Sequence, residues 1–565
     1  MDNSSALFQF VRENNPPGNN FKLSHTVRGT TNIGQIIPIL CDECVPGDVW
    51  NIGYELGLRC QPLVAPIMDH LIVEIDYFFV PYRLLFDNWE QFITGGKDGN
   101  YTTSLPTMSW TNAVKGTFWD YLGLPLATDV GISPDNLASV KAKPLAFPWL
   151  AYNMILFDYY IDQNFPNSRF QGSVPNQLPY SWDDLTSEEQ LNNSIAYRAY
   201  KKDYFTSALP FQQRGTAPSL PLSGFAPVGI NLGNGFTQIS VSGATDNNSS
   251  LSTKFSTMLN SDDVLTNLAS SNNAMFGGVT AGFNGPSTFQ LGDIVRKPVL
   301  TDASGLSTFT VPDMRLAFQI QKWMEMNARG GSRYVEFLQA HFGVSPRDET
   351  LQRPQFLGRV SQRVLISEVL QHSESSSTSA LGDMAGHGIS YAENHVDTFR
   401  CTEYGLIIGL MSVMPTQSYF QGINRQWLRR SRFDFYFPEF ANLSEQGIYN
   451  AEIFVSDDSS DPDSDFLDTI NGEVFGFQGR YDEMRIKQNK IVGQMRDTFD
   501  YWHLARKFTT LPNLGSDFIT VDPTDFKRIF AVQDEDQLYF EFNNVITSRR
   551  PLPAIPDPGL IDHVY

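Results

Sequence analysis

The chain has 565 residues with 62 acidic and 41 basic side chains, and its formal charge of −21 at pH 7 excludes a surface that binds nucleic acid over most of its area. Phenylalanine (42), tyrosine (22), glycine (42) and proline (33) are abundant, which favours many short strands around a large aromatic core. The sequence has no apolar run of about 18 residues, which excludes a transmembrane helix, and its start, MDNSSALFQF, lacks the pattern of a secretory signal.

Residues 1–70 are predicted to form an extended N-terminal arm. The stretch NNPPGNN (14–20) has the composition of a turn or linker, and proline and glycine interrupt the short apolar runs that follow it. Such a segment has little core of its own. We therefore expect it to lie against other elements or against neighbouring subunits of an assembly.

The four cysteines are expected to be reduced thiols in a cytoplasm, because no signal for export is present. Cys41 and Cys44 form a CxxC pair, but a tetrahedral zinc site needs two further ligands, and Cys60 and Cys401 are not paired in the sequence. The eight histidines show no metal-ligand spacing. No metal site is predicted from these residues.

Residues 71–96 predict a strand followed by a short amphipathic helix. In the first ten of them, LIVEIDYFFV, side chains alternate between two faces, and Pro81 ends the strand. Leu85, Trp89 and Phe92 then share one side of a helix that stops at two glycines. This apolar side requires a sheet to cover.

Residues 215–292 show the clearest change in composition. Between Arg214 and Asp293 only four residues are charged, and glycine, serine, threonine and asparagine dominate. Brief alternation without a helical stripe predicts a long insertion of loops and short strands. Loops of this length inside a domain are more often functional than passive, so we expect a projecting surface loop, with a flexible linker as the alternative.

Two helices are predicted after the insertion. The first is expected to begin with Asp313 as its N-cap and to stop at Gly330, and the second to run from a cap at Ser332 to Gly343. Four later runs predict strands, namely RVLISEVL (363–370), YGLIIGLMSV (404–413), RFDFYF (432–437) and AEIFV (451–455).

Motifs of the common enzyme classes do not occur. The sequence has no GxSxG, no HExxH and no P-loop, so an enzyme is not expected. A glycan-binding or glycan-hydrolysing β protein remains the alternative, because the two carboxylates of a glycosidase need no sequence motif.

Two basic clusters contain the candidate nucleic-acid-binding residues. They comprise Arg425, Trp427, Arg429, Arg430, Arg432, Arg549 and Arg550. Guanidinium groups can bind phosphates bidentately, and Trp427 offers a stacking plane for an unpaired base. Pairing of these arginines with carboxylates of a neighbouring subunit is an equal alternative.

The acidic run DDSSDPDSDFLD is a weak calcium candidate. Asp461, Asp463 and Asp465 alternate as calcium ligands do, but Phe466 and Gly472 occupy the positions where an EF-hand needs glycine and glutamate. A solvated acidic turn is the alternative, and no other cofactor is expected.

Residues 547–565 are predicted to be an extended C-terminal tail. They end in RPLPAIPDPGLIDHVY, which is rich in proline and has no helical or strand period. We expect packing against other parts of an assembly to fix such a tail.

The segment DYFFVPYRLLFDNWEQF resembles a stretch of the major capsid proteins of gokushovirus-like microviruses, which are small icosahedral phages with single-stranded DNA. Further blocks resemble the same family in the same order, namely CDECVPGD (41–48), DYFTSALPF (203–211), AFQIQKWMEMNARGGSRYVEFLQAHFGV (317–344), LQRPQFLG (351–358), RFDFYFPEFANLSEQ (432–446) and RPLPAIPDPGLIDH (550–563).

The resemblance implies a mainly β chain, 1–565, that forms one elaborated domain: an eight-stranded antiparallel jelly-roll sandwich with long inserted loops and a few helices. About sixty copies would form a T=1 icosahedral virion around a circular single-stranded DNA genome, assembled in the bacterial cytoplasm. The 215–292 insertion would be a threefold protrusion for attachment to a host cell-surface receptor. An internal scaffolding protein, a small basic DNA-packaging protein and a DNA pilot protein are the other implied partners, without insertion into a membrane.

Overall fold

A computed structural model describes the chain over residues 18–108, 114–131, 142–165, 194–218, 311–331, 333–370, 384–458 and 465–554. Two compact units are present, one formed by Met1–Gly215 with Met324–Tyr565 and the other by Thr216–Trp323. The sequence had predicted a single domain with an insertion at 215–292. Nearly all of that insertion lies outside the described residues. Except for residues 311–323, which belong to the second unit, the elements below belong to the first unit.

Strands dominate this unit, as the composition predicts. They are β1 (Asn19–Lys22), β2 (His25–Thr31), β3 (Gln35–Cys44), β4 (Val49–Cys60), β5 (Leu71–Pro81), β6 (Ala196–Tyr197), β7 (Gln355–Arg363), β8 (Leu365–Leu370), β9 (Met384–Arg400), β10 (Gly405–Pro415), β11 (Glu445–Tyr449), β12 (Val474–Gly479) and β13 (Leu538–Arg550). The helices are α1 (Tyr82–Leu85), α2 (Trp89–Thr94), α3 (Phe118–Tyr121), α4 (Ala127–Val130), α6 (Phe147–Ile155), α11 (Val311–Gly330), α12 (Tyr334–Phe342), α13 (Asn450–Ile453), α14 (Asp482–Arg485) and α15 (Ser516–Ile519), and the π-helix η2 (Leu156–Tyr160) continues α6.

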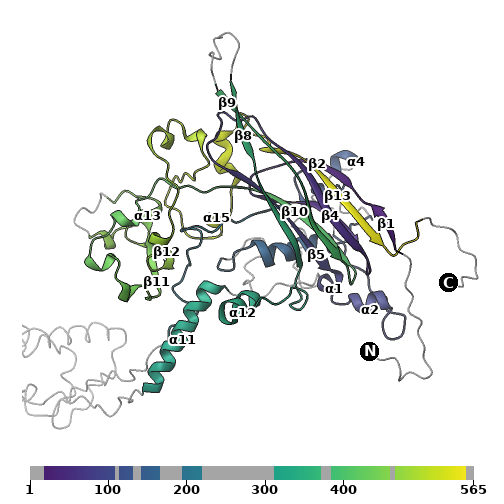
Figure 1. Cartoon of the computed structure of the whole chain (residues 1–565), viewed down its shortest axis with the longest axis horizontal. Coiled ribbons are helices and arrows are strands. Elements are labelled where there is room, and N and C mark those ends of the chain that lie inside the picture. Colours follow the sequence, from purple (N-terminus) through teal and green to yellow (C-terminus); the bar gives the residue numbers. More distant parts are fainter. Residues whose placement is uncertain are drawn as a thin grey trace, which may run out of the picture. The chain divides into compact units, whose positions relative to one another are not determined.

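Two antiparallel sheets form the framework (Figure 1). The six-stranded sheet has the order β1-β13-β4-β9-β8, with β2 also pairing with β13, and the five-stranded sheet has the order β6-β3-β10-β5-β7. Strands that follow one another in the chain alternate between the sheets from β2 to β5, so the two sheets can only form together. The expectation of a mainly β, antiparallel chain is confirmed.

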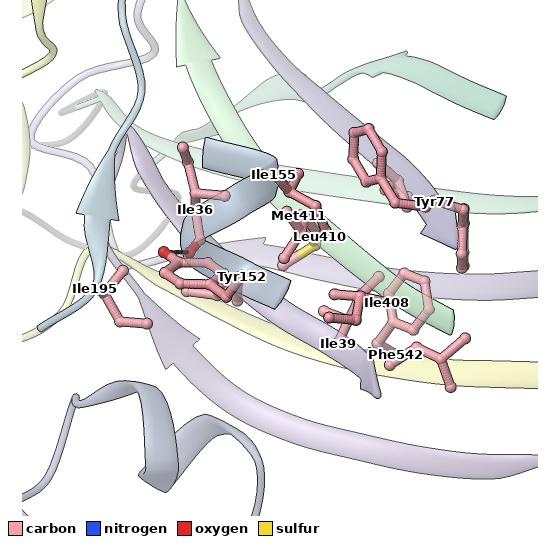
Figure 2. Close-up of a cluster of buried hydrophobic side chains, with 14 of the residues drawn as sticks. Ile36, Ile39, Tyr77, Tyr152, Ile155, Ile195, Ile408, Leu410, Met411 and Phe542 are labelled. Atoms are coloured by element: carbon pink, nitrogen blue, oxygen red, sulfur yellow. Dashed lines mark hydrogen bonds between the residues drawn. The ribbon is translucent and has the colours of Figure 1, made fainter. Parts of the chain in front are cut away.

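The strand β10 lies in the middle of the five-stranded sheet and is buried along its whole length. One face of this sheet packs against the six-stranded sheet, where the buried Asn544 side chain of β13 donates a hydrogen bond to the carbonyl oxygen of Ile39 at 2.9 Å. The other face is covered by α6, whose Tyr152 hydroxyl donates to the carbonyl oxygen of Ile36 at 2.8 Å (Figure 2). Burial on both faces explains the unbroken apolar sequence of β10.

The strands β7 and β8 form a corner between the two sheets. Only Val364 separates them, and its backbone N–H donates to the carbonyl oxygen of Leu71 at 2.9 Å. Because β7 pairs with β5 and β8 pairs with β9, the chain changes sheet at this residue. A smaller cluster of buried aromatic and aliphatic side chains packs behind the two-stranded sheet β11-β12, and we call this part of the unit the β11–β12 lobe.

Several predicted elements are confirmed. The run LIVEIDYFFV is β5, paired with β10 from Leu71↔Pro415 to Pro81↔Gly405. The two helices after the insertion are α11 and α12, and α12 stops at Gly343 in the left-handed conformation, with φ 68°. Their starts differ from the expectation, because α11 already begins at Val311 and α12 follows Arg333.

Other expectations were wrong. Residues 1–70 are not an extended arm over their described part, because residues 19–60 form the strands β1 to β4 of the two sheets. The proposed tail 547–565 starts too early, since β13 continues to Arg550. The run RFDFYF forms a 3₁₀ turn and loop, and AEIFV is mainly the helix α13.

The expectation of four reduced thiols is corrected as well. Cys44 at the end of β3 and Cys401 just after β9 form a disulfide with Cα atoms 6.6 Å apart. Cys41 and Cys60 are free thiols, and burial raises the pKa of each to about 12. The two cysteines of the CxxC pair are therefore not bonded to each other, since Cys44 is bonded to Cys401 and Cys41 is a free thiol.

Candidate nucleic-acid and subunit interface

The first predicted basic cluster lies on the β11–β12 lobe. Its residues occupy the 3₁₀ turns η6 (Arg425–Trp427) and η7 (Arg432–Asp434) and the loop between them, ahead of a third turn, η8 (Pro438–Phe440). The two turns bring the cluster together in space, but they do not give its arginines the same environment.

Arg425 is committed to the interior of the lobe. Its Nη1 donates to Glu452 Oε1 at 2.8 Å and to the carbonyl oxygen of Gly447 at 2.6 Å, and its guanidinium lies 4.6 Å from the ring centre of Tyr449. The Glu452 carboxylate is buried and also accepts a hydrogen bond from the Tyr204 hydroxyl at 3.0 Å. Arg425 thus compensates a buried negative charge, which is a structural role.

Arg429 has a similar role. Its Nη2 lies 3.7 Å from Glu483 Oε1, and its guanidinium covers the ring of Phe435 with 5.3 Å to the centre. The Glu483 carboxylate is buried, and its Oε2 accepts a hydrogen bond from Gln446 Nε2 at 2.8 Å. Neither Arg425 nor Arg429 presents a free charge.

Arg430 and Arg432 differ from these two. The guanidinium of Arg430 lies 4.6 Å from the ring centre of Phe466, and that of Arg432 lies 4.7 Å from the ring centre of Phe433. Both side chains are exposed, and among the described residues neither pairs with a carboxylate. A guanidinium stacked on a ring keeps its N–H donors at the edge, where they can bind an incoming anion.

Several large aromatic side chains close to these two arginines in the sequence are exposed. Trp427 is 73% exposed, and the run after η7 adds Phe433 at 50%, Phe435 at 52%, Tyr436 at 51% and Phe437 at 41%. We call these five residues with Arg430 and Arg432 the aromatic platform. Only Trp427 and the arginines had been singled out from the sequence. The sequence signal for the other four is a run of six residues with four aromatics, followed by Pro438. Its alternation predicts a strand, and so its exposed rings were missed.

The backbone beneath the aromatic platform is held in place. Ser431 and Asp434 form a capping box around η7. Arg480 Nη2 donates to the carbonyl oxygen of Phe433 at 3.3 Å, and the buried Tyr481 hydroxyl donates to that of Phe435 at 3.2 Å. Tyr481 itself adopts a left-handed backbone conformation with φ 66°, which is uncommon for a residue other than glycine. The exposed rings are therefore presented by a fixed segment.

The second basic cluster, Arg549 and Arg550, also contains one paired and one exposed arginine. The Arg550 guanidinium lies 5.0 Å from the ring centre of Trp50, its Nε is 3.3 Å from Asp48 Oδ2, and its Nη2 donates to the carbonyl oxygen of Glu43 at 2.8 Å. Burial raises the pKa of Asp48, and Arg550 opposes this effect. Arg549 is exposed and has no carboxylate partner in the described part of the chain.

Acidic side chains of β5 form a further cluster that the sequence did not reveal. Glu74 binds Arg198 at 2.5 Å and Lys201 at 2.6 Å, and Asp76 binds Arg359 and accepts a hydrogen bond from the Tyr160 hydroxyl. Burial alone would raise the pKa of Glu74, but the neighbouring cations outweigh it and hold the pKa below its usual value. The cluster joins β5 to three distant segments, namely η2, residues 198–201 and β7, and has the character of a structural ion-pair network.

The calcium candidate remains untested. Asp461 and Asp463 lie outside the described residues, and Asp465 accepts the backbone N–H of Phe466 at 2.9 Å as the cap of a 3₁₀ turn. Among the residues that the structure describes, no three His, Cys, Asp or Glu side chains are close enough to hold a metal ion. In the same residues, no helix is long and apolar enough to cross a membrane.

Comparisons with known proteins agree with one another. The family model described as "Capsid protein (F protein)" matches residues 11–560. The chain is 32% identical to the capsid protein VP1 of Chlamydia phage 1, over 96% of this chain and 95% of that protein. It is 31% identical to the capsid protein VP1 of Spiroplasma virus 4, over 98% and 97%, and 30% identical to that of Bdellovibrio phage phiMH2K, over 95% of each.

Proposed function

Because this chain belongs to the F-protein family of capsid proteins, we propose that about sixty copies of it form a T=1 icosahedral shell around a circular single-stranded DNA genome. It is a structural protein of the virion, and the resemblance to microvirus major capsid proteins is confirmed. This conclusion rests on the extent of the match, which covers nearly the whole of this chain and of its relatives. A match over one fragment would not indicate a complete shell subunit.

The strand order supports a jelly roll as the shell-forming fold. An eight-stranded jelly roll places strands one, eight, three and six in one sheet and two, seven, four and five in the other. Numbered from β2 and leaving out β6, β8 and the separate pair β11-β12, this chain has β2-β13-β4-β9 and β3-β10-β5-β7 in those places. The short strand β1 and the corner strand β8 are then additions at the edges.

The charge of the chain supports a separate source of positive charge inside the shell. A formal charge of −21 per copy would repel a genome of the same sign. We therefore keep the small basic DNA-packaging protein as a proposed partner, together with an internal scaffolding protein and a DNA pilot protein. Direct DNA contact by the chain is proposed for Arg549, since Arg425, Arg429 and Arg550 are committed to carboxylates.

The insertion 215–292 is proposed to attach the particle to a host cell-surface receptor. Its support is the sequence alone, because residues 219–310 lie outside the described part of the chain. A long, weakly charged insertion can vary without disturbing a shell-forming framework, which suits a receptor-binding role.

The test is to purify the protein made together with its phage's other structural proteins and to examine it by negative-stain microscopy, light scattering and nuclease protection. Uniform shells of one size that protect single-stranded DNA are expected. The control is nuclease treatment after the shells have been opened with denaturant, which should degrade the DNA. A stable monomer that hydrolyses glycans would contradict the proposal and favour the alternative function.

A further inference from the structure

The aromatic platform has the properties of a contact surface. Exposed large apolar side chains scattered singly need no explanation, but here five exposed aromatic side chains lie within eleven residues of one segment. The backbone beneath them is fixed by hydrogen bonds from Arg480 and Tyr481, so a ligand would not have to order the segment when it binds.

The chemistry of the platform indicates what it binds. Exposed aromatic rings are the usual partners of proline-rich segments, which reach them already extended and lose little entropy on binding. Arg430 and Arg432 offer N–H donors that no carboxylate of the described chain occupies. A proline-rich, acidic and extended peptide would fit both features.

The chain contains such a segment in its own C-terminal tail. Residues 551–565, PLPAIPDPGLIDHVY, carry four prolines, the acidic residues Asp557 and Asp562, and no lysine or arginine. The tail leaves the six-stranded sheet beside β1, where Asn19 Nδ2 donates to the carbonyl oxygen of Leu552 at 2.7 Å. Residues 555–565 continue from this point and lie outside the described part of the chain.

We propose that the aromatic platform binds the tail 555–565 of a neighbouring copy of this chain. Within one copy the β11–β12 lobe and the Arg550 end of β13 lie on opposite sides of the unit (Figure 1). Eleven residues in the extended proline helix span about 34 Å, which suits a reach onto an adjacent subunit. The contact is head-to-tail, the type that closes rings in a symmetric shell.

Single-stranded DNA is the competing ligand, because bases stack on aromatic rings and phosphates bind arginine. A DNA groove, however, needs a track of cations along the backbone. Ion pairing removes Arg425 and Arg429 from such a track and leaves two arginines beside five aromatic rings. This ratio favours an apolar peptide with few charges over a polyanion.

The test uses photo-crosslinking in assembled particles. The photoreactive amino acid p-benzoylphenylalanine replaces Phe437, and particles are assembled from a mixture of ¹⁴N-labelled and ¹⁵N-labelled copies. Mass spectrometry after irradiation is expected to show crosslinks to the peptide 551–565, with pairs of mixed isotope composition. Crosslinks to DNA, to another part of the chain or only within one copy would overturn the proposal. Such a result would not contradict the proposed shell function, because the particles would still have assembled.

A binding measurement decides the matter if the substituted chain does not assemble. A fluorescent peptide of residues 551–565 is titrated with full-length subunits released from particles, and binding is followed by anisotropy. The double variant Arg430→Gln/Arg432→Gln is expected to bind about tenfold more weakly, as is a peptide with Asp557→Asn and Asp562→Asn. Arg28→Gln, which alters an exposed arginine of β2, is the matched control and should bind normally. Absence of binding by the wild-type subunit, or equal binding by the double variant, would refute the contact.

Discussion

Arg359 and Asp76 stand directly opposite each other on β7 and β5 and are joined by two parallel hydrogen bonds, Nε to Oδ1 at 2.5 Å and Nη2 to Oδ2 at 2.9 Å. The Asp76 side chain is 1% exposed, whereas that of Arg359 is 44% exposed. The hydrogen bonds from Asp76 raise the pKa of Arg359, and the pair holds the edge strand β7 in register beside the corner to β8.

Replacing this arginine is expected to destabilise the subunit strongly. Arg359→Met keeps the aliphatic stem but leaves a buried carboxylate without its main partner, which costs about 3 kcal/mol of the free energy of unfolding. Urea denaturation of isolated subunits would measure the loss. Arg28→Met is the matched control, because its pair with Glu541 is exposed on both sides and should change stability by less than about 1 kcal/mol. Equal losses in the two variants would contradict a special role for the buried pair.

The buried carboxyl group of Asp158 predicts a dependence of stability on pH. Burial raises its pKa to about 6, against the attraction of Arg353 and Arg333. A carboxyl whose pKa is higher in the folded than in the unfolded chain binds a proton more tightly when folded, so its contribution is lost as the pH rises from about 4 to 6. The loss is on the order of 2 kcal/mol. Compared with the wild type, Asp158→Asn should therefore gain relative stability between pH 4 and pH 7, and parallel denaturation curves at all pH values would disprove the assignment.

Deletion of residues 225–288 tests the insertion. Particles should still assemble, because the described strands of both sheets lie outside this range, and adsorption to host cells should be lost. Microscopy would count the particles and a binding assay with host cells would measure adsorption. Failure to assemble would show that the segment is part of the shell architecture.

Substitution of Arg549 tests whether this side chain contacts the genome directly. Arg549→Gln should leave assembly unchanged, because this side chain is exposed, but its particles should release DNA at lower salt than the wild type does. Arg28→Gln removes an exposed positive charge elsewhere and serves as the control. An unchanged salt midpoint for the release of DNA would exclude Arg549 from the genome contact.

Sequence periodicity predicted the elements whose pattern is contained within one continuous segment of the chain. Alternation located β5, and helical spacing located α11 and α12. The burial differs from these patterns, because β5 is buried on both faces, α11 buries Ala328 alone and α12 buries none of its residues. The run RFDFYF misled because alternation over six residues also arises in a loop when the rings are exposed. Here the Asp434 capping box and Pro438 determine the turn.

Long-range partners could not be predicted from the sequence. β1 is a strand because Asn19 pairs with Arg550 at the far end of the chain, and Cys44 is bonded to a residue 357 positions later. The candidate site shows the same limit, since the arginines were found from their spacing. The carboxylates of Glu452 and Glu483 determine which arginines are free to bind a ligand, and the positions of these carboxylates are known only from the fold.

The place of β13 also determines when a newly made chain can fold. This strand pairs with β1, β2 and β4, and Leu538 lies opposite Thr31. A ribosome adding about 5–20 residues per second needs roughly 25–100 s to synthesise the residues between those two positions. During that interval the strands β1, β2 and β4 lack their shared partner, so the six-stranded sheet is completed only after β13 has been synthesised. A truncated chain lacking its last strand would leave the other strands of this sheet incompletely paired, and it would be excluded from assembly by its own incomplete fold.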